Sequence, residues 1–318
     1  RKMSGRLLSD FINAGKRPRN QIATLSGLTN TYIRNLENGQ IENVPRYRLI
    51  ALGVALNLDL SEMEALLQAF DRAQLDSSDV PTFLDVSKNI SLSEADLSVR
   101  DMFAYELVLL SLEMTPGPQV IVNDRPTISL LEHRHRTHSY RAVLSRHRMY
   151  NELIEAVGQA RRDNFFHLVS RHRIDHYICR RCLEDYLQED FDSPEHLWRA
   201  RHVGKLLDVV KNEDKFHLFL TDACVNFNFT MKMGCESGDP DKLSYSARAP
   251  HEVNRSKRGR LIGFITENPN LCQCFKEELA RVSESVINDL RDRDSQIEYL
   301  NHLLQPVLHE LGESHEHT

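Results

Sequence analysis

The segment IATLSGLTNTYIRNLENG, residues 22–39, decides the fold of the N-terminal part of this chain. Small and apolar residues recur in it at helical spacing, and Gly27 interrupts them. Glycine tolerates the left-handed conformation that ends a helix, a threonine such as Thr29 can cap the start of the next helix, and Gly39 can end that one. The segment therefore predicts two short helices joined by a tight corner, a helix-turn-helix whose second helix is polar on its outer face.

Apolar residues at helical spacing predict five short helices in the first 73 residues, over about 5–14, 19–26, 30–38, 45–56 and 61–73. Residues 1–56 carry nine Lys and Arg against three Asp and Glu, whereas the whole 318-residue chain has a net charge of −6. A basic head on an acidic protein can meet phosphate groups without the whole surface attracting polyanions.

The corner resembles the helix-turn-helix of the Cro-like phage-repressor (XRE) family, and the resemblance covers roughly residues 5–73. The following segment VPRYRLIALGVALNL, residues 44–58, is similar to the family's next helix. One departure is Arg19, since the family often has Gln at the start of the first of the two helices. The places of the family pattern are filled by Ile22, Ala23, Gly27, Leu28, Thr29, Ile33, Glu37 and Gly39.

This resemblance implies a DNA-binding role for the outer face of the second helix, with base contacts in the major groove. The implied base-reading residues are Asn30, Thr31, Arg34 and Asn35. The implied contacts to the DNA backbone are Arg19, Thr29, Tyr32, Asn38, Arg46 and Arg48. The alternative is a compact helical bundle whose polar face simply meets water.

The remaining chain predicts a linker over residues 76–90 and a larger α/β or α+β domain over 91–318, behind a head over 1–75. Expected elements are a helix near 92–113, a strand at QVIVN (119–123), a strand at NFFHLVS (164–170) and a helix at RIDHYICRRCLEDYL (173–187). A helix over about 194–212 and several alternating strands follow. The architecture expected for the chain is thus multidomain, with an all-α head of five short helices and one larger α/β or α+β domain that ends in a long helix.

A long helix is expected at the end of the chain, from Phe275 to about Gly312. Its apolar residues keep heptad spacing, which fits either a dimer seam or packing on its own domain. The segments DKFHLFLTD (214–222) and RLIGFITENPNLCQCFKEEL (260–279), a strand that leads into a helix after Asn-Pro, are similar in part to degenerate phospholipase-D-like sensor domains. The His-x-Lys motif of that family's chemistry is absent, so this resemblance implies no catalysis.

Three groups of residues could sense a signal, and two of them are small clusters. Thiolate and imidazole ligands at short spacing suit zinc or iron, and the predicted set is His172, His176, Cys179 and Cys182. We favour the alternative of inert thiols, because the other cysteines make no second Cys-x-x-Cys. An anionic effector could meet Arg255, Lys257, Arg258 and Arg260, although we favour a charged hairpin tip as their explanation.

A run rich in histidine and arginine, residues 133–148, could bind nucleic acid or a phosphorylated effector. We favour its pairing with the acidic segment 57–124, which carries thirteen Asp and Glu against three Lys and Arg. Opposite charges so close in sequence can pair between neighbouring parts of a chain, although solvent screens exposed pairs.

No glycine-rich phosphate loop, Gly-x-Ser-x-Gly or His-Glu-x-x-His motif occurs, so we expect no enzyme activity and no cofactor. The apolar runs are too short for a membrane, and six cysteines in 318 residues favour reduced thiols in the cytoplasm. The sequence favours a transcription regulator that binds double-stranded operator DNA as a homodimer and senses a signal, such as a small-molecule effector. The alternatives are an enzyme or defence effector that uses the head for targeting, and a protein that recruits a partner to DNA.

Overall fold

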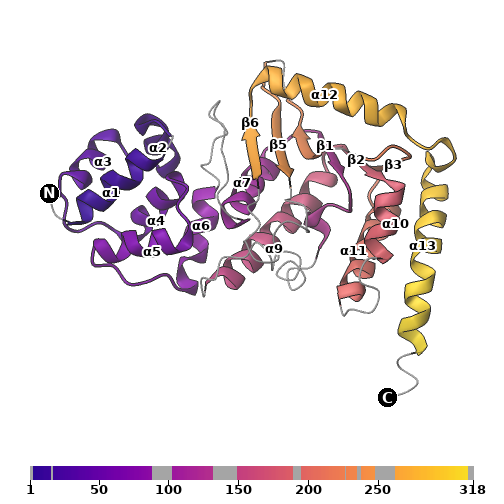
Figure 1. The fold of residues 1–318 in the computed structure, drawn as a ribbon, viewed down its shortest axis with the longest axis horizontal. Coiled ribbons are helices and arrows are strands. Elements are labelled where there is room, and N and C mark those ends of the chain that lie inside the picture. The colour runs from indigo at the N-terminus through magenta and orange to yellow at the C-terminus, as the bar shows by residue number, and fades with distance from the viewer. Residues whose placement is uncertain are drawn as a thin grey trace.

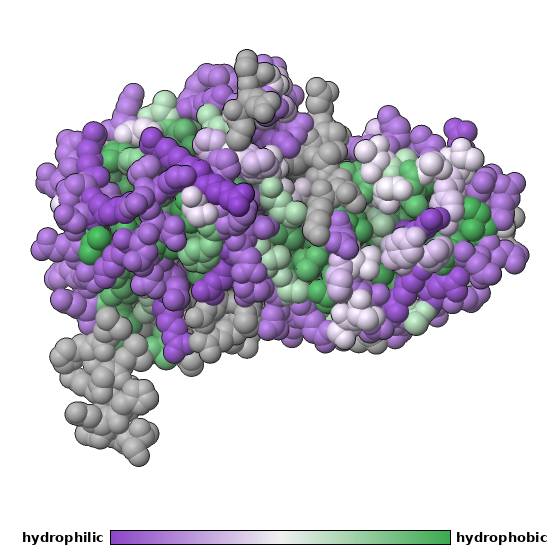
Figure 2. Space-filling model, turned by 180° about the vertical axis from the view of Figure 1, so that it is seen from behind, coloured by the Kyte–Doolittle hydropathy of each residue, from purple (hydrophilic) through white to green (hydrophobic). Residues whose placement is uncertain are grey.

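The computed structural model describes residues 3–15, 17–87, 102–131, 149–188, 195–225, 227–234, 238–247 and 262–313. The expected anion-binding group 255–260 and the basic run 133–148 lie outside these residues. The described chain has a mixed α/β architecture, in which N-terminal helices lead into a six-stranded mixed sheet flanked by helices (Figure 1). Polar residues predominate on the face of the molecule in Figure 2, where the N-terminal helices lie on the right.

Helices overlap all five ranges expected near the N-terminus. They are α1 (Met3–Ala14), α2 (Arg19–Ser26), α3 (Asn30–Glu37), α4 (Arg46–Ala55) and α5 (Leu60–Ala69). The last of them ends earlier than the expected residue 73, because Asp71 adopts a left-handed conformation with φ of 54°. The amide of Arg72 then donates to Leu67 O at 2.9 Å and closes the end of the helix.

The segment 76–90, expected to be a linker, is largely helical where the structure describes it. It forms the short 3-10 turn η1 (Ser77–Asp79) and helix α6 (Val80–Ser87), in which Phe83 is fully buried. Helix α6 contacts α4 on one side and, on the other, α7 (Met102–Met114) and α9 (Tyr150–Val169), as its place in Figure 1 shows. One apolar core therefore continues from the N-terminal helices through α6 into α7 and α9.

The sheet has the strand order β3-β2-β1-β4-β5-β6. Strands β1, β2 and β3 are parallel, whereas β4, β5 and β6 continue the sheet in antiparallel pairs. The strands are β1 (Gln119–Asn123), β2 (Ile174–Cys179), β3 (Phe216–Thr221), β4 (Asn228–Lys232), β5 (Lys242–Ala247) and β6 (Ile262–Thr266).

Helices cover both faces of the sheet and make three layers (Figure 1). One face packs on α9, α10 (Arg180–Gln188), α11 (Glu195–Asn212) and α13 (Arg293–Glu313), and the other packs on α12 (Pro269–Glu284). The alternation of side chains along β2 produces this division. Ile174 and Ile178 join the first core, and Tyr177 joins the second.

Two expected elements between residues 164 and 187 are wrong. The segment 164–170 lies at the end of helix α9 rather than in a strand, and residues 174–179 form strand β2 rather than the start of a helix. Phe165 and Leu168, buried in the core, lie three residues apart on one face of α9, a spacing that fits a helix better than a strand. Residues 174–179 pair with β1 on one side and β3 on the other. A strand buried in this way is rich in apolar residues, and this pattern can be mistaken for the apolar spacing of a helix.

The expected single helix from 275 to 312 is also wrong. It is two helices, α12 and α13, separated by the 3-10 turn η4 (Asn288–Leu290). The amide of Ile287 donates to Leu220 O at 2.9 Å, which ties the break to the edge strand β3. Leu300, Leu304 and Val307 of α13 are buried in the same core as α11, so the apolar face of this helix packs on its own chain.

A buried ion pair joins helices α7 and α9. Arg161 of α9 donates to both carboxylate oxygens of Glu113 in α7, at 3.0 and 2.7 Å, and Ser129 Oγ donates to the same carboxylate at 2.9 Å. Both charged side chains are at most 6% exposed. Removal of one partner would leave the other charge buried without compensation, which costs much more than the pair itself contributes.

Substitution Arg161→Met should therefore lower the free energy of unfolding by about 3–5 kcal/mol, measured by urea denaturation. The double variant Glu113→Leu, Arg161→Met should recover most of that loss, because it removes both charges from the core. The exposed Arg171→Ala serves as the control and should change stability by less than about 0.5 kcal/mol. Equal losses in Arg161→Met and Arg171→Ala would contradict the structural role of the pair.

Candidate functional site

The corner between α2 and α3 is built by backbone hydrogen bonds within six residues. Gly27 is left-handed, with φ of 64°, and its amide donates to Thr24 O at 3.2 Å, while the amide of Leu28 donates to Ala23 O at 3.0 Å. Thr29 then caps α3, since its Oγ1 accepts from the amide of Tyr32 at 3.1 Å. This arrangement ends one helix and starts the next within three residues, as the sequence predicted.

Helix α3 presents a polar face to solvent and an apolar face to the core. Ile33 and Leu36 are buried, and α3 contacts α1 and α2. Among the expected base-reading residues, Asn30, Thr31 and Arg34 are exposed and Asn35 is half-buried. Asn38, one turn further, is exposed as well. The structure thus brings these side chains together along one short helix.

An ion pair fixes the angle between the two helices. Arg19, the first residue of α2, forms a double hydrogen bond with the carboxylate of Glu37, the last residue of α3, and its Nη2 lies 2.8 Å from Oε1. Hydrogen bonding to Glu37 raises the pKa of Arg19. The carboxylate of Glu37 is buried and binds the guanidinium of Arg19, which we expected to contact a phosphate. Arg19 thus holds the start of α2 against the end of α3.

The end of α3 also lies very close to α1. A Cβ atom at Gly5 would lie 2.3 Å from Glu37 O, so the two backbones meet at a distance that only glycine permits. Glu37 is therefore held by α1 through its backbone and by α2 through its side chain. Three helices meet at this residue.

Arg46, another expected backbone contact, is also paired within the chain. It donates to Asp79 Oδ2 at 2.5 Å and to the carbonyl of Gln74, which joins the start of α4 to η1. Arg48 instead lies over the ring of Tyr32, with 4.9 Å from Cζ to the ring centroid, and donates to the hydroxyl of Tyr47 at 3.2 Å. Hydrogen bonds to these two tyrosines raise the pKa of Arg48.

A different cluster forms at the carboxyl ends of β2 and β3. Cys179 ends β2, Cys182 lies in the first turn of α10, and Cys224 follows β3. Their three sulfur atoms lie within 4.8 Å of one another, and the Sγ atoms of Cys179 and Cys224 are 3.7 Å apart. Burial and the neighbouring thiols raise the pKa of Cys182 well above its usual range.

The two histidines of the expected metal set are not part of this cluster, which corrects that prediction. His176 and Cys179 point to opposite faces of β2, because three residues separate them in a strand rather than in a helix. His172 precedes β2 at the other end of the strand. Cys224 was missed because only the pairing of Cys179 with Thr221 in neighbouring strands brings it near.

His176 is fully buried and takes part in a hydrogen-bond network within the core. Its Nε2 accepts from the amide of Thr127 at 3.0 Å, and its Nδ1 lies 3.3 Å from Ile121 O. The carbonyl of Thr127 accepts from His202 Nε2 at 2.9 Å, and His202 Nδ1 lies 2.9 Å from the hydroxyl of Tyr186. Both imidazoles are therefore engaged in hydrogen bonds within the core.

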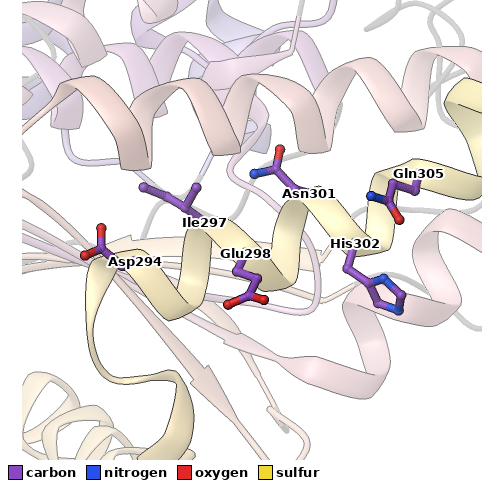
Figure 3. Close-up of a pocket in the computed structure, with 6 residues that line it drawn as sticks. All are labelled: Asp294, Ile297, Glu298, Asn301, His302 and Gln305. Atoms are coloured by element: carbon purple, nitrogen blue, oxygen red, sulfur yellow. The ribbon is translucent and has the colours of Figure 1, made fainter.

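A hollow of about 480 Å³ lies along α13 (Figure 3). Ile297 and Asn301 point to one side of the helix in this view, and Glu298 and His302 point to the other. All six lining residues come from this one helix, so no polar groups from other elements converge on the space. Ligand pockets fix their ligands by such convergence, and this hollow does not identify an effector site.

No helix in the described part of the chain combines the length and apolarity that crossing a bilayer requires. Comparison of the sequence with models of known families found no match, and neither did comparison with curated proteins.

Burial lowers the pKa of His176 to about 4, whereas unfolding returns it to its ordinary value near 6.5. The unfolded chain then binds more protons between these values, so folding stability should fall as pH falls from about 6.5 towards 4. The part due to His176 amounts to about 3 kcal/mol over that range. Urea denaturation at pH 7.5 and at pH 5 should show the loss in the natural chain and a smaller one in His176→Gln. The exposed His167→Gln is the control, and an equal change in both variants would contradict this origin.

Proposed function

We propose that this chain is a sequence-specific DNA-binding transcription regulator whose N-terminal helices form a Cro-like (XRE) helix-turn-helix head. The observation that carries the proposal is the geometry of α2 and α3. A corner of three residues and the Arg19–Glu37 pair hold α3 in one orientation, with Asn30, Thr31 and Arg34 directed to solvent. A short helix with a polar, exposed face suits insertion into the major groove.

Within this proposal the residues of α3 have separate roles. Asn30 and Asn35 carry amides that can pair with adenine, and Arg34 carries a guanidinium that can pair with guanine. Arg48, Thr29, Tyr32 and Asn38 hold the DNA backbone and set the register of α3. Arg19 and Arg46 are assigned structural roles, because each is engaged by carboxylates of the same chain.

The regulatory step would use the continuous core between the N-terminal helices and the rest of the chain. Helix α6 contacts α4 and also α7 and α9, so a shift of α7 or α9 would move the head as well. A signal bound by the α/β part would then change DNA affinity through the orientation of the heads, without a catalytic step.

The first test identifies the DNA sequence by selection from a random duplex library and then compares variants on that sequence and on random DNA. Asn35→Ala and Arg34→Ala should weaken specific binding by about 1–3 kcal/mol each, because a base contact is lost. Non-specific binding should stay nearly unchanged for Asn35→Ala, because its amide carries no charge. Equal losses of Asn35→Ala on both DNAs would contradict base reading.

Arg48→Ala should weaken binding to both DNAs and reduce the dependence of affinity on salt by about one counterion, as expected of a phosphate contact. The exposed Gln68→Ala on α5 is the matched control and should change neither affinity. Loss of binding in Gln68→Ala to the same extent would point to a different interface.

We further propose that two chains bind one operator, since a single head of this size contacts few base pairs. Sedimentation of the protein with the selected duplex should give a complex with two chains per duplex, and the half-sites should lie about one helical turn apart. A saturated complex with one chain would contradict this arrangement.

A further inference from the structure

The thiol cluster at the carboxyl ends of β2 and β3 draws its three residues from three different elements. Cys179 is the last residue of a central strand, Cys182 belongs to the following helix, and Cys224 belongs to the loop after the neighbouring strand. The parallel pairing of β2 with β3 sets their separation, because it places Cys179 beside Thr221. The sheet therefore determines the position of the sulfur atoms before any ligand binds.

The spacing of the sulfur atoms matches the requirements of one metal ion. A bond length of about 2.3 Å to each thiolate places neighbouring sulfur atoms about 3.8 Å apart in a tetrahedral site. The Sγ atoms of Cys179 and Cys224 are 3.7 Å apart, and all three lie within 4.8 Å of one another. Small side-chain rotations would bring three sulfur atoms to a common ion.

The surroundings allow an ion to enter and then hold it. Cys179 is buried, Cys182 is half-buried and Cys224 is exposed, so the cluster runs from the core to the surface. Loops at the carboxyl ends of parallel strands are the usual place for ligands in open α/β sheets. Thr221 Oγ1 donates to Ala223 O at 2.9 Å and steadies the turn that leads to Cys224.

We propose that Cys179, Cys182 and Cys224 bind one thiophilic metal ion of the kind that prefers thiolate ligands, such as Zn²⁺ or Cu⁺. Binding forms three metal–sulfur bonds, each thiol gives its proton to the buffer, and the ion gives up the water molecules that the thiolates replace. The site rests on this geometry alone. Its use as the signal that controls DNA binding rests on the proposed function.

The experiment uses the full chain, reduced and then freed of reductant and metal under anaerobic conditions, with Cd²⁺ alone as the probe. Cadmium thiolates absorb in the ultraviolet, so a titration followed by absorbance reports both the stoichiometry and the thiolate ligands. We expect one Cd²⁺ per chain. Cys224→Ser should weaken Cd²⁺ binding at least about tenfold. Mutation of a residue that only hydrogen-bonds to a ligand already lowers metal affinity by about 10–100-fold, and Cys224 is proposed as a ligand itself.

Cys274→Ser is the matched control, because Cys274 is an exposed cysteine on α12 outside the cluster. It should bind Cd²⁺ like the natural chain. Cys235 lies outside the described residues and is present in both variants, so it cannot account for a difference between them. Circular dichroism should show that Cys224→Ser remains folded, because Cys224 is exposed.

The proposal is overturned if the reduced chain does not bind Cd²⁺, or if Cys224→Ser binds it as tightly as Cys274→Ser does. Affinity of the metal-free chain for the selected DNA is measured on the same preparation. The same measurement is repeated with Cd²⁺ bound. DNA binding without Cd²⁺ binding would reject the metal site alone, and Cd²⁺ binding without DNA binding in either state of the chain would reject the proposed function alone.

Discussion

The arrangement of this chain depends on an apolar core that continues from α1 to α9. Phe83 of α6 is fully buried within it, between the N-terminal helices and the pair α7 and α9. A flexible tether would let the N-terminal helices turn freely, whereas a helix packed on both sides holds them in one orientation. Arg46 strengthens this junction, since it joins the start of α4 to Asp79 just before α6. Packing against α6 therefore sets the orientation of the N-terminal helices.

Two of the arginines in the basic N-terminal segment are already paired with carboxylates of the same chain. Arg19 and Arg46 are cations of a basic segment, yet buried or partly buried carboxylates of the same chain engage both. Arg34 and Arg48 are the cations that lie near the outer face of α3, and Arg48 is steadied by two tyrosine rings. A count of positive charge alone overstates what this surface offers to a phosphate backbone, because a paired guanidinium is already neutralised.

The cysteines illustrate how strongly chemistry depends on the backbone that carries it. In a helix, residues three apart lie on one face, and His176 would stand beside Cys179. In strand β2 the same two residues point to opposite faces, so the imidazole joins the core network and the thiol meets Cys182 and Cys224. A helix at these residues would offer His176 and Cys179 as neighbouring ligands, whereas the strand offers Cys179 with Cys182 and Cys224.

Local sequence by itself determined the corner at Gly27, the cap at Thr29, the end of α3 at Gly39, the N-terminal helices and most strands. These features depend on residues within one turn of each other, so their causes are visible in a short window. Asn57 and Asp71 end their helices in the same left-handed way, but their residue type does not require it. Only the tertiary structure decided that Glu37 takes Arg19, that Cys224 joins Cys179, and that α13 packs on α11. Each of these contacts joins segments far apart in the chain, and their distance is set by how the sheet and helices pack.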